Sequence, residues 1–320
     1  MKSGLVALVG RPNVGKSTLL NGLLGRKVAI MSDKPQTTRS VIRGVLRRPQ
    51  GEAVLVDTPG LHKPRTLLGQ RLNDLVRGTL AEVDLVCVLV DAAAGVGGGD
   101  RFLAAEVAKV ATPALCVVNK MDAAPRARMV AALQAAGGLM GLAHDQDHGI
   151  PEGDQAGRHG HAQAPLADWA EVVPVSARTG EQLDLLVELL FRHLPEGRPL
   201  YPEGHVSDEP EQHLVAELIR EQALALVHQE LPHSIAVLVD ELGPDPDRDD
   251  LLVVRATLFV ERPSQKPIVL GKGGALLRQI GTRARAELEA LLGTHLYLDL
   301  HVKVAKEWQR DPRQLARLGF

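Results

Sequence analysis

A loop near the start of the chain has the residue types and spacing that hold a phosphate. The stretch GRPNVGKST at 10–18 follows an apolar run and satisfies the pattern G-x-x-x-x-G-K-[ST]. In this pattern the glycines let backbone N–H groups approach phosphate oxygens, and the N-terminus of the following helix adds partial positive charge. Lys16 would neutralise the β and γ phosphates, and the Ser17 hydroxyl would bind Mg²⁺. The residues assigned to this nucleotide site are Gly10, Asn13, Val14, Gly15, Lys16, Ser17 and Thr18.

A second motif, DTPG, begins at Asp57 directly after the apolar run AVLV. A carboxylate at a strand end can hold the Mg²⁺ of a phosphate-loop enzyme through water. Gly60 can give its N–H to the γ-phosphate and lets the chain move when that phosphate leaves. In this position, after a phosphate loop, the motif indicates a nucleotide-sensing switch.

A third motif, NKMD, ends another apolar run and contributes Asn119, Lys120 and Asp122. Guanine presents two donors, N1–H and the N2 amino group, on one edge, and a carboxylate can accept both. Adenine lacks that pair of donors, so Asp122 should select GTP. Ser176 and Ala177 follow a later strand, from which a backbone N–H could reach guanine O6.

Short apolar runs alternate with amphipathic segments over the first two hundred residues, which predicts an α/β fold with a mainly parallel, doubly wound sheet. Ligands bind such sheets at the carboxyl ends of the strands, where the three motifs lie. The predicted strands are 4–10, 40–48, 53–60, 84–92, 114–120 and 171–177, and 182–194 is a predicted helix.

Length and composition indicate the number of domains and the kind of core. The 320 residues favour two domains, and the cores must be aliphatic because aromatic residues make up only 2%. The net charge of −2 hides an asymmetry: 251–320 holds twelve Lys or Arg against six Asp or Glu, a net of +6.

Cys87 and Cys116 lie in apolar runs, so we expect buried thiols and no disulfide framework. The lack of a disulfide framework fits a reducing cytoplasm, where we expect the protein to be. The start of the chain has too short an apolar run for a signal peptide, and no stretch approaches the ~20 apolar residues of a membrane span.

The C-terminal third has a different element order. A linker rich in Pro and Gly at 196–208 separates a predicted first domain, 1–195, from a second, 209–320. The second domain should contain a helix at 211–231, strands at 234–242 and 251–262, a helix at 274–293 and a strand at 295–304. This order predicts a small α+β domain.

The stretch VLGKGGALLRQIG at 269–281 cannot be a second phosphate loop, because Lys272 is followed by Gly273 and no hydroxyl is available for a metal. Gly271 and Gly274 instead give G-x-x-G between a predicted strand and a helix, the pattern of a KH domain, whose loop clamps the backbone of single-stranded RNA. Lys272 can pair with a phosphate. Low aromatic content suggests an apolar groove for the bases, with Ile268, Leu270 and Ile280 as candidates. The predicted RNA contacts are Gly271, Lys272, Gly273, Gly274, Arg278, Arg283 and Lys303, extended by Arg285 along the helix and by Lys306, the two lysines lying beyond the last strand.

With these motifs in place, the sequence resembles the Era family of GTPases over nearly its whole length. KPQTTR at 34–39 looks like the first switch of that family, and YPEGHVSDEPEQHLVAELIRE and ELPHSIAV look like its linker and second domain. The resemblance implies a GTPase domain followed by a type II KH domain. It implies GTP hydrolysis with Mg²⁺, binding of the 3′ region of small-subunit (16S) rRNA, and a role in assembly of the 30S ribosomal subunit by a monomer.

The same resemblance assigns roles to residues. Thr38, with Thr37 as the alternative, would meet Mg²⁺ and the γ-phosphate. The catalytic set is then Lys16, Thr38, Asp57 and Gly60, and the metal set is Ser17, Thr38 and Asp57.

Several alternatives stay open at this point. Leu61 stands where Ras-like enzymes carry a water-orienting glutamine, so hydrolysis is slow or another group positions the water. Asn13 suggests a bound K⁺ near the phosphates, and His62 is either a base or a surface switch residue. The loop at 141–165 holds four histidines, which leaves a metal site open. The alternative function is a signalling or membrane-associated GTPase, in peripheral contact with the cell membrane, whose C-terminal domain binds protein or lipid; a third is an RNA-binding protein that uses its GTPase domain only as a scaffold.

Overall fold

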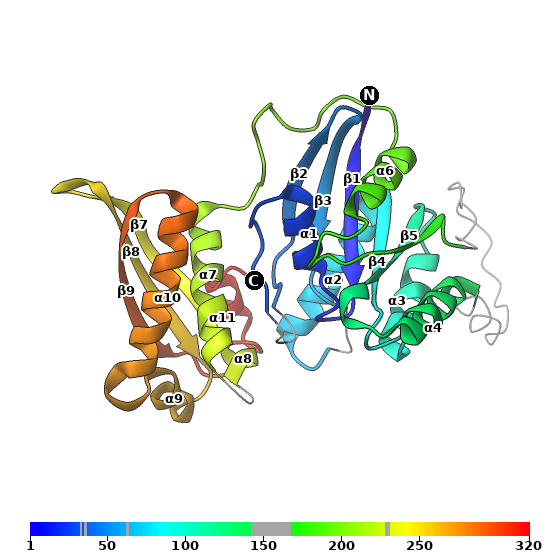
Figure 1. Cartoon of the computed structure of the whole chain (residues 1–320). Helices are drawn as coiled ribbons and strands as arrows, with labels where there is room; N and C mark the ends of the chain where they lie inside the picture. Colours follow the sequence, from blue (N-terminus) through cyan, green and yellow to red (C-terminus); the bar gives the residue numbers. More distant parts are fainter. Residues whose placement is uncertain (33, 35–36, 62–63, 142–167, 228–230) are drawn as a thin grey trace, which may run out of the picture. The chain divides into compact units, whose positions relative to one another are not determined.

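The computed structural model describes the chain except for residues 33, 35–36, 62–63, 142–167 and 228–230 (Figure 1). Contacts divide it into two compact units. The first consists of Met1–Lys27, Ser40–Lys63 and Leu72–Ser207, and the second of Val28–Arg39, Pro64–Arg71 and Asp208–Phe320. Two short stretches from the first quarter of the sequence therefore belong with the C-terminal unit.

The first unit contains a six-stranded sheet in the order β2-β3-β1-β4-β5-β6. All neighbouring strands are parallel except β2, which runs antiparallel to β3. The predicted mainly parallel sheet is confirmed. The strands are β1 (Lys2–Gly10), β2 (Ile42–Arg48), β3 (Gly51–Asp57), β4 (Leu85–Asp91), β5 (Ala114–Asn119) and β6 (Glu171–Pro174).

Burial explains why these runs form the centre of the sheet. Every residue of β3, β4 and β5 is buried, which matches the apolar runs AVLV, LVCVLV and ALCVV that make up most of these strands. A parallel strand covered by helices on both faces needs apolar side chains on both faces. Cys87 in β4 and Cys116 in β5 are buried free thiols, as predicted, and burial raises the pKa of Cys116 to about 12.

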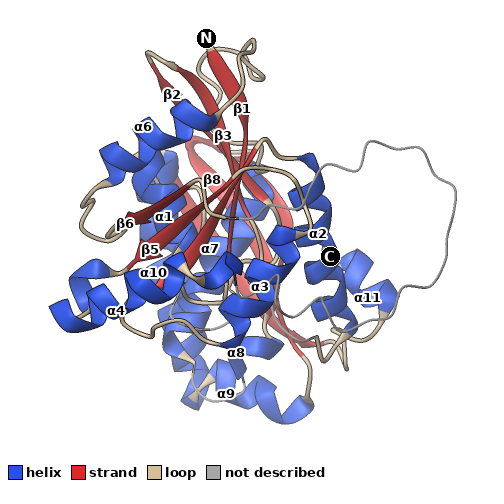
Figure 2. Ribbon diagram, turned by 90° about the vertical axis from the view of Figure 1, so that its right-hand side faces the viewer, coloured by secondary structure: helices blue, strands red, loops and turns tan. Residues whose placement is uncertain are grey.

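Helices cover both faces of this sheet. The helices α1 (Lys16–Leu24) and α6 (Leu183–His193) contact one face. The other face packs against α2 (Leu67–Glu82), α3 (Gly98–Ala108) and α4 (Arg126–Gly137) through a shared aliphatic cluster. Figure 2 shows the strands passing between α1 and α6 on one side and α2 and α3 on the other. The predicted doubly wound fold is confirmed.

The second unit is built on a three-stranded sheet in the order β7-β8-β9, with β7 antiparallel and β9 parallel to β8. The long helices α7 and α10 pack on one face of it around an aliphatic core (Figure 1). The predicted α+β unit is confirmed. Its elements are α7 (Glu211–Leu226), α8 (Leu231–Ser234), β7 (Ala236–Asp245), β8 (Arg248–Val260), α9 (Lys266–Leu270), α10 (Ala275–Leu292), β9 (His295–Val304) and α11 (Pro312–Arg317).

Local details of the second unit differ from the prediction. The G-x-x-G loop lies between two helices, α9 and α10, and not between a strand and a helix. The segment KPIVL is too short for periodicity to separate strand from helix, and Pro267 in its first turn suits a helix start. Lys303 lies inside β9 and not beyond it, and Ile280 is fully buried in the core.

Candidate nucleotide site and nucleic-acid groove

The phosphate loop has the backbone conformation that its glycines allow. Gly15 has φ of 98° at the N-cap of α1, in the left-handed region that favours glycine, and Asn13 adopts φ of 65°. A Cβ on Gly10 would lie 2.7 Å from a methyl carbon of Val14. A Cβ on Gly15 would collide with the amide of Asn119. The loop therefore needs glycine at both positions, and it lies against the end of β5.

The backbone of the phosphate loop holds the side chain of Lys16 in place. Its side chain is buried, and Nζ donates hydrogen bonds to the carbonyl oxygens of Gly10 (3.2 Å) and Arg11 (3.1 Å). Burial lowers the pKa of Lys16, and the Asp57 carboxylate opposes that shift. The ammonium is thus aligned along the loop in which the phosphates would lie.

Asp57, fully buried at the end of β3, lies beside the first turn of α1. Ser17 Oγ donates to Asp57 Oδ2 at 2.7 Å. A hydroxyl and a carboxylate at this separation are hard oxygen ligands of the kind that Mg²⁺ prefers, so the residues present fit that ion. Gly60 follows closely, and a Cβ there would lie 2.7 Å from the nitrogen of Pro12. The DTPG segment therefore packs directly against the phosphate loop.

The two candidate switch threonines belong to the second unit by their contacts. Thr37 and Thr38 are both buried, and Thr37 Oγ1 donates to the Lys34 carbonyl at 2.6 Å. Arg220 on α7 donates to the Thr37 carbonyl. The role predicted for Thr38 at the γ-phosphate stays a prediction. Leu61 is buried in the first unit's core and has no polar atom to orient water, and His62 lies outside the described residues.

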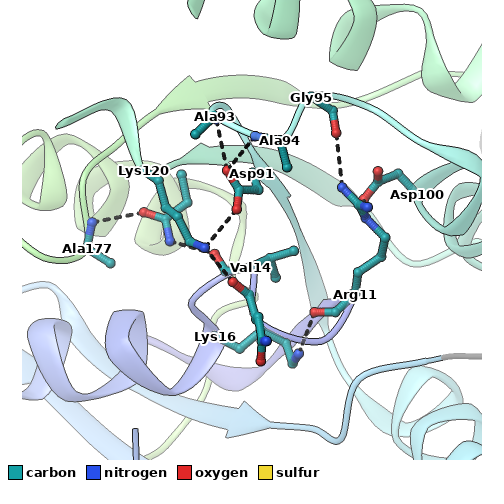
Figure 3. Close-up of polar contacts among 12 residues, drawn as sticks. Arg11, Val14, Lys16, Asp91, Ala93, Ala94, Gly95, Asp100, Lys120 and Ala177 are labelled. Carbon is teal, nitrogen blue, oxygen red and sulfur yellow. Dashed lines mark hydrogen bonds and ion pairs between the residues drawn. The ribbon is translucent and has the colours of Figure 1, made fainter. Parts of the chain in front are cut away.

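The base-recognition motif lies at the end of β5 and contacts the phosphate loop (Figure 3). Asn119 Nδ2 donates to the Val14 carbonyl at 2.8 Å, and Asn119 Oδ1 accepts from the Ala177 N–H at 2.9 Å. Ser176 Oγ donates to Asp122 Oδ1 at 2.6 Å and so orients that exposed carboxylate. The Ser176 N–H donates to the Glu181 carbonyl, so the backbone contact to guanine predicted for these two residues stays a prediction.

Arg11, Asp91 and Asp100, which had no predicted role, tie these loops together. Arg11 Nε donates to Asp100 Oδ1 at 2.8 Å, and Lys120 Nζ lies 2.7 Å from Asp91 Oδ2. Asp91 ends β4, as Asp57 ends β3. An acidic residue at the carboxyl end of a central strand lies where such sheets bind ligands, and that position could have marked Asp91 as a candidate site residue.

The G-x-x-G loop of the second unit has three glycines with positive φ, a backbone conformation that favours glycine. Gly271, Gly273 and Gly274 have φ of 70°, 59° and 79°. A Cβ on Gly271 would lie 2.8 Å from Cβ of Leu276, whereas open space surrounds Gly273 and Gly274. The exposed Lys272 lies at the tip. This loop presents backbone and an ammonium to solvent at the start of α10.

A groove of about 390 Å³ continues from this loop between α10 and β9. Arg278 and Arg285 line it from the helix, whereas the groove lining does not include Arg283, Lys303, Ile268 or Leu270. The half-exposed Tyr297 also lines the groove. Its aromatic ring was not expected there, because the low aromatic content had suggested a purely apolar groove. The lining residues are Gly274, Leu277, Arg278, Gly281, Thr282, Arg285, Tyr297, Leu298 and Leu300.

Two other predicted features receive no support from the described part of the chain. Among the described residues no cluster of three His, Cys, Asp or Glu side chains could hold a metal, and the histidine-rich stretch 141–165 lies almost wholly outside them. No described helix combines the length and apolar character needed to cross a bilayer.

Comparison with known proteins agrees with both sites. Residues 5–120 match the family model described as 50S ribosome-binding GTPase, and residues 230–309 match the KH domain model. The chain is 53% identical over 321 residues to GTPase Era of Mycobacterium sp. (strain KMS), covering 100% of this chain and 99% of that protein. It is 53% identical over 323 residues to GTPase Era of Nocardioides sp. (strain ATCC BAA-499 / JS614), covering 100% and 96%.

Two solved structures also match over the full length. One is Era in complex with MgGDPNP and nucleotides 1506–1542 of 16S ribosomal RNA, with a TM-score of 0.87 and 37% identity over 100% of this chain and 99% of that chain. The other is a point variant of Aquifex aeolicus Era bound to GDP·AlF4⁻, with a TM-score of 0.86 and 36% identity over the same shares. Since the similarity extends over the whole length of the chain, through both units, the chain belongs to the Era family of GTPases, which bind GTP and GDP and hydrolyse GTP.

Proposed function

We propose that this GTPase binds the 3′ region of small-subunit rRNA through its second unit and acts in assembly of the 30S ribosomal subunit. The observation that carries the proposal is the left-handed G-x-x-G loop with Lys272 at its tip, opening onto a groove lined by Arg278 and Arg285. Backbone clamping by such a loop and basic side chains along the groove suit a single RNA strand. A relative of similar length carries nucleotides 1506–1542 of 16S rRNA in its solved structure. The proposed domain limits are 1–195 and 209–320, joined by 196–208.

The hydrolytic roles follow from the first unit. Ser17 and Asp57 would hold Mg²⁺ with Thr38, and that ion would supply charge neutralisation at the β and γ phosphates. Lys16 would add its ammonium along the loop, and the Gly60 N–H would donate to the γ-phosphate. Leu61 cannot orient a water molecule, so slow hydrolysis in the isolated protein is expected.

A bound K⁺ beside Asn13 remains part of the proposal as a second cation at the phosphates. Asn13 is exposed on the phosphate loop, with φ of 65°. Hydrolysis measured in KCl and in NaCl at equal ionic strength tests it: faster turnover in KCl is expected, and equal rates would remove K⁺ from the mechanism.

We propose further that the nucleotide state controls RNA binding. Supporting this, the stretch with Thr38 and the stretch 64–71 after the DTPG motif both cluster with the RNA-binding unit. Segments that sense the γ-phosphate would then change the unit that holds RNA.

The RNA proposal is tested by fluorescence anisotropy with a labelled single strand matching the 3′ end of small-subunit rRNA, in GTP analogue at fixed salt. Binding is expected, with loss in Gly273→Asp, which puts a carboxylate and a strained φ into the loop. A scrambled strand of equal length is the sequence control. Equal binding by the wild type and Gly273→Asp would contradict the assignment of the loop.

The alternative, a membrane-associated or signalling GTPase, has no observation in its favour among the described residues. Flotation with anionic vesicles, with RNA-free protein, separates the two: the proposal expects the protein to remain in the aqueous fraction, in line with a cytoplasmic location and a monomeric RNA-binding role.

A further inference from the structure

Asp91 ends β4 with both carboxylate oxygens engaged (Figure 3). Its Oδ1 accepts the N–H groups of Ala93 (2.8 Å) and Ala94 (3.0 Å), which closes the turn that follows the strand. Its Oδ2 lies 2.7 Å from Lys120 Nζ. One carboxylate thus joins the end of β4 to the base-recognition motif.

Lys120 carries this connection to the phosphate loop. Its ammonium also donates to the carbonyl oxygen of Asn13 at 2.5 Å. Asn13 and Lys120 both adopt φ of 65°, in a region that non-glycine residues rarely occupy. The ammonium therefore fixes the distance between the phosphate loop at Asn13 and the base-recognition motif at Lys120. The first would face the phosphates of the nucleotide and the second its base.

A second tie connects the same turn to the phosphate loop. Arg11 donates to Asp100 Oδ1 at 2.8 Å and to the Gly95 carbonyl at 3.0 Å. A Cβ on Gly99 would lie 2.7 Å from Cδ of Arg11, so the arginine stem packs closely on the start of α3. The carbonyl of Arg11 in turn accepts from Lys16 Nζ. Gly95 and Asp100 therefore both contact the phosphate loop, through Arg11.

The charge state of Asp91 agrees with this geometry. Burial alone would raise the pKa of Asp91, but the hydrogen bond from Lys120, those from Ala94 and Ala93, and the charge of Lys120 together lower it. The Asp91 side chain is 12% exposed and that of Lys120 is 35% exposed, so the pair is partly shielded from solvent. A charge-assisted hydrogen bond of this kind is stronger than a neutral one.

We infer that Asp91 is a positioning residue for guanine-nucleotide binding, which acts through Lys120 to hold the phosphate loop and the base-recognition motif at a fixed spacing. Asp91 is not among the residues assigned to the nucleotide above, and its two oxygens contact Ala93, Ala94 and Lys120. Its removal should weaken binding of the nucleotide as a whole and should leave the chemical step largely unchanged, because Lys16, Ser17 and Asp57 are held by other contacts.

The competing explanation is that Asp91 only closes its turn. Asp91→Asn separates the two, because an asparagine Oδ1 can still accept from Ala93 and Ala94 while its NH₂ group faces the Lys120 ammonium without attraction. We expect the dissociation constant for a fluorescent GDP analogue to rise roughly tenfold. The turnover number at saturating GTP should stay within about twofold of the wild type.

The matched control is Glu106→Gln, which removes another partly exposed carboxylate of the first unit, paired with Lys109 at 2.7 Å and Arg77 at 3.1 Å, away from the site. It should bind the GDP analogue like the wild type. Thermal unfolding of all variants without nucleotide reports any general loss of stability, and the inference expects Asp91→Asn and Glu106→Gln to unfold within a few degrees of one another.

A double-mutant cycle with Lys120→Met tests the route. If Asp91 acts through Lys120, Asp91→Asn should add no further loss of affinity in the Lys120→Met background. Independent, additive losses would overturn the inference, as would unchanged GDP affinity in Asp91→Asn. A loss of affinity matched by a large fall in thermal midpoint would also overturn it, since that is the signature of a merely structural role.

Discussion

Asp122 is exposed after β5 and receives a hydrogen bond from Ser176 Oγ at 2.6 Å. A carboxylate oriented in this way can accept the two donors on the guanine edge, and the site is expected to reject adenine for lack of them. Asp122→Ala should therefore reduce the preference for GDP over ADP by at least about a hundredfold. Competition of both nucleotides against a fluorescent GDP analogue measures it.

The control for this substitution is Asp184→Ala, which removes an exposed carboxylate on α6 in the same unit. It should leave the preference unchanged. A preference that survives in Asp122→Ala would mean that another group reads the base.

Residue roles at the strand ends could be predicted because each motif follows a buried apolar run. Asp57, Asn119 and Asp122 were found in this way, and the structure places the first two beside the phosphate loop. Asp91 stands in the same structural position at the end of β4, but no motif surrounds it. Its partner Lys120 comes much later in the sequence, and only the parallel pairing of β4 with β5 brings the two together.

Helix α7 contributes Glu217 and Arg220 to a buried ionic cluster that also includes Arg39. Arg220 donates to Glu217 Oε1 at 2.7 Å and to the Thr37 carbonyl, and Arg39 donates to the Ile235 carbonyl at 2.6 Å. All these charged side chains are buried. Removing one member leaves the others uncompensated, so Glu217→Ala should destabilise the second unit by about 3–5 kcal/mol.

Urea unfolding followed by Trp308, which is fully buried in this unit, measures the effect in a Trp169→Phe background. The control Gln212→Ala changes an exposed residue of α7 and should cost little. An unfolding free energy unchanged in Glu217→Ala would show that the cluster contributes nothing net.

The same cluster predicts a pH dependence. Burial would raise the pKa of Glu217, but the charge of Arg220 and its hydrogen bond to the carboxylate, with His213 and Arg39, together lower it. A carboxylate with a folded pKa below its unfolded value of about 4.3 stabilises the fold above that pH and loses this contribution as pH falls. The stability difference between the wild type and Glu217→Ala should therefore shrink under acid, and a constant difference down to low pH would contradict the assignment.

Helix α10 offers a comparison between two arginines. Arg285 lines the groove with Arg278, whereas Arg283, also a predicted RNA contact, is exposed but absent from the groove lining. Arg285→Ala should weaken binding of the rRNA strand and lower the slope of log affinity against log salt by about one. Arg283→Ala, the same change on the same helix, should have the smaller effect, and the reverse order would place the RNA on another face of α10.

Helical phase also explains why some groove residues could not be predicted. Ile280 was predicted to line the groove, but it lies on the face of α10 that packs into the core, where its side chain is fully buried. By contrast β9, with its alternating pattern over 295–304, was predicted at its observed bounds. The direction of β2 and the short helix α9 depended on tertiary pairing and on a five-residue run, neither of which periodicity resolves.

The stretch 28–39 clusters with the second unit but contains Thr38, the threonine proposed for the nucleotide site. Residues 28–39 belong to the second unit, where Arg220 holds the Thr37 carbonyl, while Thr38 is proposed to serve Mg²⁺ and the γ-phosphate in the first. A nucleotide that recruits Thr38 would compete with the contacts on α7. This competition is the physical basis that we propose for control of RNA binding by GTP.

The most direct test is the dissociation constant of the 3′-end rRNA strand measured with GTP analogue and with GDP, at one salt concentration and in excess nucleotide. We expect tighter binding with the GTP analogue, by at least about fivefold, the lower end of usual coupling free energies. Lys16→Ala, which should bind neither nucleotide well, should lose the difference. Equal dissociation constants in the two nucleotide states of the wild type would contradict the coupling and leave a GTPase whose RNA binding does not depend on its nucleotide.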